Sequence, residues 1–266
     1  MNQFAYGSDW IQELWRHREL FYFLAWRDIK LRYKQTVLGV LWALIQPLFT
    51  MLVFTLFFGN LAKIPSDGAP YPLFYIAALL PWTYFAATLA TAGNSLVVNA
   101  QLITKVYFPR AILPVSGAMS GLLDFAIGCL ILVGLMIYYG VQPGWSLLMW
   151  PILLIPLVLV TVGIGMILAS LNVRYRDIKY ALPFMIQLWL FVTPVIYPTS
   201  IIPERFRFLA ALNPLTGIID AFRKSIIPSQ EIDWQLLLVS SLLTLFIFAA
   251  GLVFFRKTER TFADIV

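Results

Sequence analysis

The chain alternates long apolar segments with short polar connections. A helix of about 20 apolar residues crosses the roughly 30 Å of hydrocarbon in a bilayer. By this measure six segments are predicted to span a membrane: Val37–Phe58, Tyr71–Ala92, Ala111–Tyr138, Leu147–Leu171, Tyr180–Tyr197 and Trp234–Phe255. The fifth is short and contains two prolines, so its ends are the hardest to predict. The pattern predicts an all-α, polytopic membrane protein with residues 1–266 forming one transmembrane domain.

Two segments outside the spans also have a helical pattern. In residues 9–34, the side chains of Trp10, Leu14, Phe21 and Leu24 recur at helical spacing, and charged residues fill the other side. This profile predicts an amphipathic helix in the membrane interface. The alternative, a helix surrounded by water, would expose several aromatic rings.

The segment between the fifth and sixth spans, residues 198–233, is too apolar for a free loop. It alternates apolar pairs such as Ile201-Ile202 with prolines such as Pro214. Irregular backbone at membrane depth needs protein or water around it. We therefore predict short amphipathic or re-entrant helices at the outer face.

Composition excludes a soluble protein. Hydrophobic residues make up 61% of the chain and charged residues 12%, with a mean hydropathy of +0.82. A soluble domain has a charged fraction of about 25%. The net charge of +6 does not indicate nucleic-acid binding, because Lys and Arg sit in short clusters between apolar runs.

The same basic residues predict the orientation. Fourteen Lys and Arg residues lie in the N-terminal segment, the second and fourth connections and the C-terminal tail taken together, and five lie in the remaining connections. Cytoplasmic connections carry the excess of Lys and Arg in membrane proteins. Both termini are therefore predicted to lie in the cytoplasm, with the chain in the inner (cytoplasmic) membrane.

Residues for enzyme chemistry are scarce. The chain contains no G-x-x-x-x-G-K-[ST] phosphate loop, so it does not hydrolyse ATP by that route. Its one histidine, His17, lies among charged residues, and its one cysteine, Cys129, lies in an apolar run. We predict no catalytic residues, no bound cofactor and no metal site.

Asp124 is the clearest functional candidate inside a span. A lone carboxylate there costs several kcal/mol, so it is either functional or hydrogen-bonded. Three roles stay open: an ion or proton relay, a polar pathway, and a structural hydrogen bond. We expect Gln46, Gln187 and Asn94 as its partners.

Aromatic side chains inside the spans are candidates for a sugar pathway, since an aromatic face stacks on the apolar face of a sugar ring. Tyr75 and Trp82 are seven residues apart and share a helix face, and Trp189 lies near the centre of its segment. Trp42 joins them as a pathway candidate. The alternative for each ring is ordinary packing between helices.

A charged hexapeptide, residues 174–179, connects the fourth and fifth segments. One interpretation is an ordinary positively charged inner loop. The other is a short connector presented to a cytoplasmic partner. Composition alone does not choose between them.

Three sequence motifs resemble those of one protein family. The first comprises Arg32-Tyr33-Lys34-Gln35-Thr36-Val37-Leu38-Gly39-Val40-Leu41-Trp42 and the following Gln46-Pro47-Leu48. The second is Asn172-Val173-Arg174-Tyr175-Arg176-Asp177-Ile178, and the third is Leu212-Asn213-Pro214-Leu215. Together they resemble the permeases of type-2 ABC exporters of polysaccharides, which include O-antigen, capsule and teichoic-acid permeases. The O-antigen and teichoic-acid branch is the more similar, and we expect O-antigen as the polymer.

This resemblance implies a homodimer whose spans enclose a channel for a lipid-linked polysaccharide. It implies a separate cytoplasmic ATPase subunit, present in two copies, which binds the ATP. The expected ATPase contacts are Arg174, Arg176, Asp177, Lys179, Lys105 and Arg110. Two other classes stay open: an ion-coupled secondary transporter or channel that uses Asp124, and a membrane-embedded glycosyl- or phosphotransferase. The latter would need clustered acidic residues or a metal site.

Overall fold

The computed structural model describes residues 16–34, 39–142, 144–227, 230–259 and 262, and within these ranges it is helical with no strand. Its helices are, in chain order, α2 (Arg18–Lys34), α3 (Leu41–Phe54), η1 (Thr55–Leu61), α4 (Tyr71–Val98), α5 (Ala100–Lys105), α6 (Ile112–Tyr139), η2 (Trp145–Met149), α7 (Trp150–Arg174), α8 (Ile178–Val192), η3 (Thr199–Ile201), α9 (Glu204–Ala211), α10 (Pro214–Lys224) and α11 (Trp234–Glu259). The predicted all-α class is confirmed.

Five helical stretches are long and apolar enough to cross a membrane. They are Leu41–Leu61, Tyr71–Val98, Ile112–Tyr139, Trp145–Arg174 and Trp234–Glu259. Each matches one of the predicted spans. The second continues six residues past the predicted end, because its last turns are covered by neighbouring helices and stay folded. The chain is therefore a multi-pass membrane protein.

The predicted fifth span, Tyr180–Tyr197, is shorter than expected. Its helix, α8, has 15 residues, a length of about 22 Å. It ends at Thr193, whose backbone is extended (φ −89°, ψ 137°). The cause is Pro194, because a residue that precedes proline is disfavoured in the helical region. A count of six full-length spans is therefore not confirmed.

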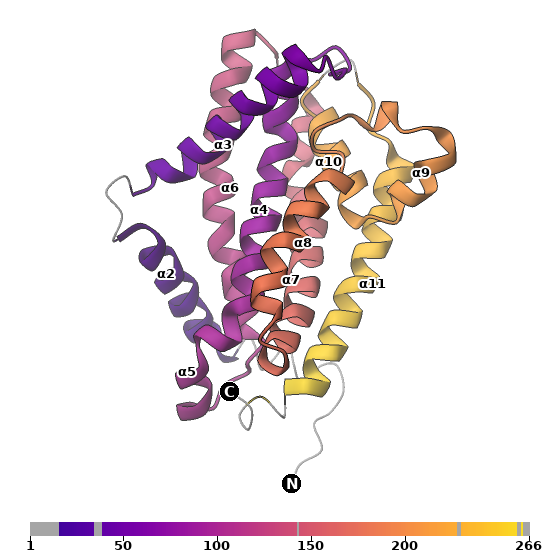
Figure 1. The fold of residues 1–266 in the computed structure, drawn as a ribbon. Coiled ribbons are helices and arrows are strands. Elements are labelled where there is room, and N and C mark those ends of the chain that lie inside the picture. The colour runs from indigo at the N-terminus through magenta and orange to yellow at the C-terminus, as the bar shows by residue number, and fades with distance from the viewer. Residues whose placement is uncertain (1–15, 35–38, 143, 228–229, 260–261, 263–266) are drawn as a thin grey trace.

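The connections predicted to be inner and those predicted to be outer lie at opposite ends of the bundle (Figure 1). The end that holds α5 also holds the α7–α8 connection and the C-terminal end of α11, and α9 lies towards the opposite end. The basic connections that were predicted to share one side thus do so. We refer to this α5 end as the basic end.

The centre of the bundle is α4. It has the largest buried share of the five candidate spans, with 78% of its most apolar stretch buried inside the chain, and it packs against α6 and α7. Two hydrophobic clusters surround it, one toward the outer half and a smaller one at the basic end. By contrast, only 11% of the corresponding stretch of α3 and η1 is buried within the chain.

Small residues set the helix spacing around this core. Two glycines of α6, Gly117 and Gly121, face α4: added Cβ atoms would lie 3.2 Å from Thr91 Cγ2 and from Tyr84 Cε2, respectively. These glycines therefore serve packing within the chain.

The described part of residues 198–233 forms three short helices, η3, α9 and α10, and their re-entrant position at the outer face stays a prediction. α10 is almost completely buried, from Pro214 to Arg223, and packs on α11, α4 and α7. Its first turn is capped by Asn213, whose side chain accepts a hydrogen bond from the Leu215 backbone N–H at 3.1 Å.

Candidate functional site

Asp124 forms a charged contact between α6 and α2. Its carboxylate pairs with the guanidinium of Arg32 and accepts a hydrogen bond from the hydroxyl of Tyr33. The Arg32 and Asp124 side chains are 30% and 27% exposed. The carboxylate is therefore both neutralised and hydrogen-bonded, which removes most of the cost of a lone charge in a span.

The partners expected for Asp124 are wrong. Gln46 and Gln187 are exposed on α3 and α8, and Asn94 accepts a hydrogen bond from Asn172 at 3.1 Å. The prediction failed because it searched only the spans for polar partners. Arg32 and Tyr33 come from the preceding helix, and hydropathy gives no sign that α2 lies against α6.

The depth of this contact follows from the length of α6. Its 28 residues measure about 42 Å, so one end must project from a hydrocarbon core of roughly 30 Å. Tyr138 and Tyr139 at the outer end are an aromatic pair of the kind found at membrane interfaces. If that pair marks the outer boundary, Asp124 lies about 22 Å from it and about 8 Å inside the opposite one.

α2 is held against the bundle along one side only. Leu24 is buried, and Leu20 and Phe21 pack with it on the smaller hydrophobic cluster. The opposite side carries exposed apolar residues, among them Phe23 and Trp26. Phe21 and Leu24 of the expected apolar face do pack on the bundle, but the opposite side, which was expected to be charged, also carries aromatic rings. Trp10 and Leu14 lie outside the described residues. The exposed rings fit an interface helix, which places aromatic side chains among lipid headgroups.

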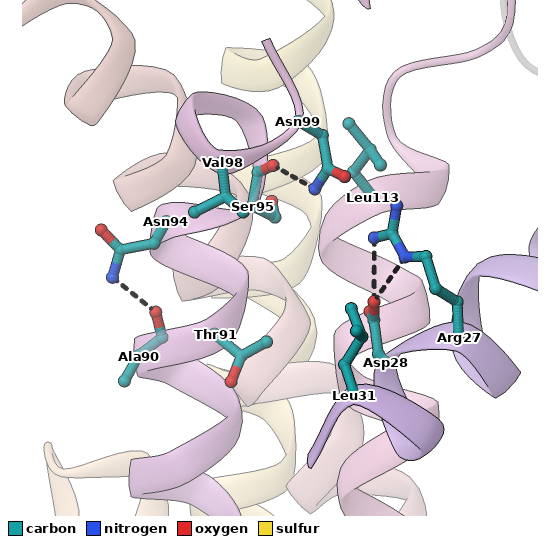
Figure 2. Close-up of a pocket in the computed structure, with 10 residues that line it drawn as sticks. All are labelled: Arg27, Asp28, Leu31, Ala90, Thr91, Asn94, Ser95, Val98, Asn99 and Leu113. Carbon is teal, nitrogen blue, oxygen red and sulfur yellow. Dashed lines mark hydrogen bonds and ion pairs between the residues drawn. The ribbon is translucent and has the colours of Figure 1, made fainter. Parts of the chain in front are cut away.

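A pocket of about 580 Å³ opens between α2 and α4, with α6 behind it (Figure 2). Six of its ten lining residues are polar: Arg27, Asp28, Thr91, Asn94, Ser95 and Asn99. The remaining four are Leu31, Ala90, Val98 and Leu113. Arg27 pairs with Asp28 at 2.9 Å, so the charges that line the pocket compensate each other.

The motif residue Asn172 ties α7 to the wall of this pocket. It is buried, and its amide nitrogen donates to the Gly93 carbonyl at 3.0 Å and to Asn94 Oδ1 at 3.1 Å. The contact lies where the charged connector after α7 begins. A displacement of that connector would therefore reach the α4 wall through two hydrogen bonds.

The predicted ATPase contacts lie at the basic end. Arg174, Arg176, Asp177, Lys179 and Lys105 are exposed, so a partner can reach them. Arg110 is different: its guanidinium binds the Glu259 carbonyl and its backbone N–H donates to Glu259 Oε1 at 2.8 Å. It joins the start of α6 to the end of α11.

The predicted pathway aromatics fall into different environments. Trp42 is 51% exposed on α3, whereas Tyr75 and Trp82 are buried in α4. Trp189 is half-buried, with its ring 5.1 Å from that of Phe85 and its Nε1 donating to Asn213 Oδ1 at 3.2 Å. Their roles in a pathway stay predictions.

A buried arginine near the outer end was missed by the sequence analysis. Arg223 donates to the carbonyls of Pro194 and Val195 at 2.8 Å and of Tyr197 at 3.1 Å, and its guanidinium lies 3.9 Å from the Phe74 ring centroid. Burial lowers the pKa of Arg223 to about 10, and nearby acidic residues oppose the shift. The arginine thus satisfies the carbonyls of the irregular segment after α8. An Arg one residue from the end of a strongly apolar helix was the available signal.

No group of three or more His, Cys, Asp or Glu residues able to hold a metal occurs in the part of the chain that the structure describes.

Comparison with known proteins decides the family. The sequence profile of the ABC-2 type transporter family matches residues 19–227. The chain belongs to the ABC-2 type transporter family. This match covers the segment from α2 to the end of α10, including the Arg32–Asp124 contact and the α2–α4 pocket.

Several ABC-2 relatives are similar over nearly their whole length. The O-antigen export system permease protein RfbA of Klebsiella pneumoniae is 31% identical, covering 90% of this chain and 92% of that protein. RfbA of Myxococcus xanthus is 28% identical, over 96% and 98%. The polysialic acid transport protein KpsM of Escherichia coli is 23% identical, over 88% and 91%. The family is that of a transporter permease, not of a catalytic enzyme.

Proposed function

We propose that this ABC-2 protein is the membrane permease subunit of an ATP-driven exporter of a lipid-linked polysaccharide. The observation that carries the proposal is the near full-length similarity to O-antigen permeases. The more distant polysialic acid transport protein is also named for a polysaccharide. O-antigen is the polymer we favour. The protein lies in the inner membrane, with both termini in the cytoplasm.

Energy for export comes from a separate ATPase subunit, because the chain has no phosphate loop of its own. The ATPase docks on the basic end. Exposed apolar residues next to α5, among them Val106 and Tyr107, lie beside the exposed Lys105 and supply the mixed apolar and basic surface that such docking needs.

The working unit is a homodimer with two ATPase copies. Two exposed amides support this: Gln46 of α3 and Gln187 of α8 point away from the chain's own core. A polar side chain that faces lipid is unfavourable, so these surfaces fit a partner subunit or a polar pathway better than hydrocarbon. The small buried share of α3, 11%, agrees with a surface that is covered in the assembly.

The contact of Asp124 with Arg32 weakens the alternative of an ion-coupled transporter. A relay carboxylate must be accessible to exchange protons during transport, whereas both oxygens of Asp124 are engaged by Arg32 and Tyr33. A transferase is also disfavoured, because a catalytic metal or acidic pair would need the clustering that is absent from the described residues.

Co-purification tests the proposed assembly. The chain, tagged at its C-terminus, is expressed with the ATPase encoded beside it and extracted in mild detergent. We expect a complex with the mass of two permeases and two ATPases. A permease that purifies without the ATPase, in the presence and absence of ATP, would contradict the proposal.

A further inference from the structure

The α2–α4 pocket has a mostly apolar lining surface with a few polar groups that are suited to hydroxyls. Arg27 and Asp28 are paired, and the other polar side chains, Thr91, Asn94, Ser95 and Asn99, are uncharged. Phosphate and carboxylate ligands are held by uncompensated cations. Such a cation is not among the ten lining residues, so the pocket does not match an anion.

The lining residues still offer both hydrogen-bond donors and hydrogen-bond acceptors to a ligand. Asn99 donates one N–H to the Ser95 carbonyl at 2.8 Å, which leaves a second N–H and the amide oxygen. Thr91 donates to the Ala87 carbonyl at 2.9 Å, which leaves its oxygen as an acceptor. Asp28 uses Oδ1 for Arg27, which leaves Oδ2. Donors and acceptors together match hydroxyl groups, since each hydroxyl both donates and accepts.

These groups face one another. Figure 2 shows Thr91 and Asn99 pointing from the α4 side towards Arg27, Asp28 and Leu31 of α2. Leu31, Val98 and Leu113 add apolar surface for the C–H faces of a ring. The volume, about 580 Å³, is within the range of small-molecule sites.

The pocket also lies at a suitable depth. Leu113 is the second residue of α6, and α6 is longer than the hydrocarbon core, so this end lies at or beyond the inner boundary of the membrane. A sugar chain that is anchored to a lipid carries its first sugars at this level.

We propose that the α2–α4 pocket binds hydroxyl groups of the first sugars of the exported polysaccharide before translocation. The inference rests on the proposed function and adds a recognition site for that substrate on the cytoplasmic side. The pocket wall is joined to the charged connector through Asn172 and Asn94, so an occupied pocket is in contact with the element expected to meet the ATPase.

The test is the substrate dependence of transport. Inverted membrane vesicles that contain the permease–ATPase complex are supplied with ATP and with radiolabelled lipid-linked polymer extracted from the host. Thr91→Val removes one hydroxyl at nearly constant volume, and Asp28→Asn removes the carboxylate charge. We expect each to raise the KM for polymer roughly 2- to 10-fold, the effect of one lost hydrogen bond, with kcat nearly unchanged.

Two further variants serve as controls. Thr161→Val removes a hydroxyl with the same type of bond to its own helix, to the Leu157 carbonyl at 2.6 Å, at a position of α7 that is not among the ten lining residues, and should leave the KM unchanged. Thr91→Ser keeps the hydroxyl and should restore the KM, which separates ligand contact from misfolding.

The outcomes distinguish the pocket from the function. Absence of ATP-driven uptake by the wild-type complex would contradict the proposed function itself. Wild-type uptake with an unchanged KM in both pocket variants, or with a change in kcat alone, would overturn the pocket proposal. A lower KM in Asp28→Asn would also overturn it. Arg27 would then bind the polymer more tightly once its acidic partner is removed, which would indicate a phosphate ligand.

Discussion

The guanidinium of Arg32 and the carboxylate of Asp124 lie 92 residues apart in the sequence and form an ion pair that joins α2 to α6. Tyr33 binds the same carboxylate from the next position of α2. α2 begins at the basic end, where the ATPase is expected to dock, and α6 packs along the central helix α4. The pair therefore links a helix near the docking surface to the core of the bundle.

Removal of this pair should loosen α2 more than it harms the rest of the fold. Asp124→Ala leaves the Arg32 charge unpaired at a partly buried position and should lower stability by about 1–3 kcal/mol. Asp124→Asn should cost less and keep most export, because the amide still accepts a hydrogen bond. Thermal unfolding can be followed with a thiol-reactive dye, since the single cysteine, Cys129, is only partly accessible in the folded chain.

A double-mutant cycle isolates the contact. Arg32→Ala and Asp124→Ala together should cost less than the sum of the two single changes. Strict additivity would show that the two side chains do not interact. Near-complete loss of export in Asp124→Asn, with normal stability, would instead favour a relay.

Charge reversal of the connector after α7 should uncouple the ATPase. Arg174 and Arg176 are exposed, and the Arg174 guanidinium contacts the ring of its neighbour Tyr175 at the surface, so a double change to Glu should leave insertion and dimerisation intact. We expect loss of ATPase co-purification and of surface polysaccharide. The matched control is Arg205→Glu with Arg207→Glu on α9, two exposed arginines toward the other end. Unchanged export in the connector variant would return it to an ordinary inner loop.

The two tryptophans Trp42 and Trp82 should respond differently to truncation. Trp82 is 5% exposed and packs in the core, so Trp82→Ala should cost about 3–5 kcal/mol and lower the yield of folded protein. Trp42 is 51% exposed, so Trp42→Ala should leave yield unchanged. If Trp42 lines the glycan pathway, export per folded dimer falls in that variant. Normal export in Trp42→Ala would remove it from the pathway.

Reporter fusions test the orientation. Fusions after Lys105 and Arg176 should report cytoplasm, and fusions after Asp67 and Val141 should report the outer side. The short α8 makes the comparison of Arg176 with a further fusion after Ile227 the informative one, since these two positions flank the only helix below spanning length among the apolar helices described. The same signal at both positions would contradict a membrane crossing by α8.

Hydropathy predicted the five long spans because burial in lipid imposes a length and a composition on each helix independently of the others. The grouping of the basic connections at one end of the bundle was likewise predicted from the positions of Lys and Arg in the sequence. The same information could not place the Arg32–Asp124 pair, since it depends on how α2 packs against α6. Hydropathy did not predict the end of α8 either, because most of the residues that follow Val192 are also apolar; only Pro194 indicated that the helix ends there. The burial of Arg223 could not be predicted either, because its three carbonyl partners become available only once the segment after α8 has folded over α10.

The central claim is that this chain exports a polysaccharide with energy from a partner ATPase. The most direct measurement compares surface and intracellular polysaccharide in the host under three conditions: with both subunits intact, with this gene deleted, and with the phosphate-loop Lys of the ATPase replaced. We predict that surface polymer disappears in the second and third conditions, while lipid-linked polymer accumulates inside the cell. Surface polymer that persists with the inactive ATPase, and is lost only when the proton gradient is dissipated, would contradict the account.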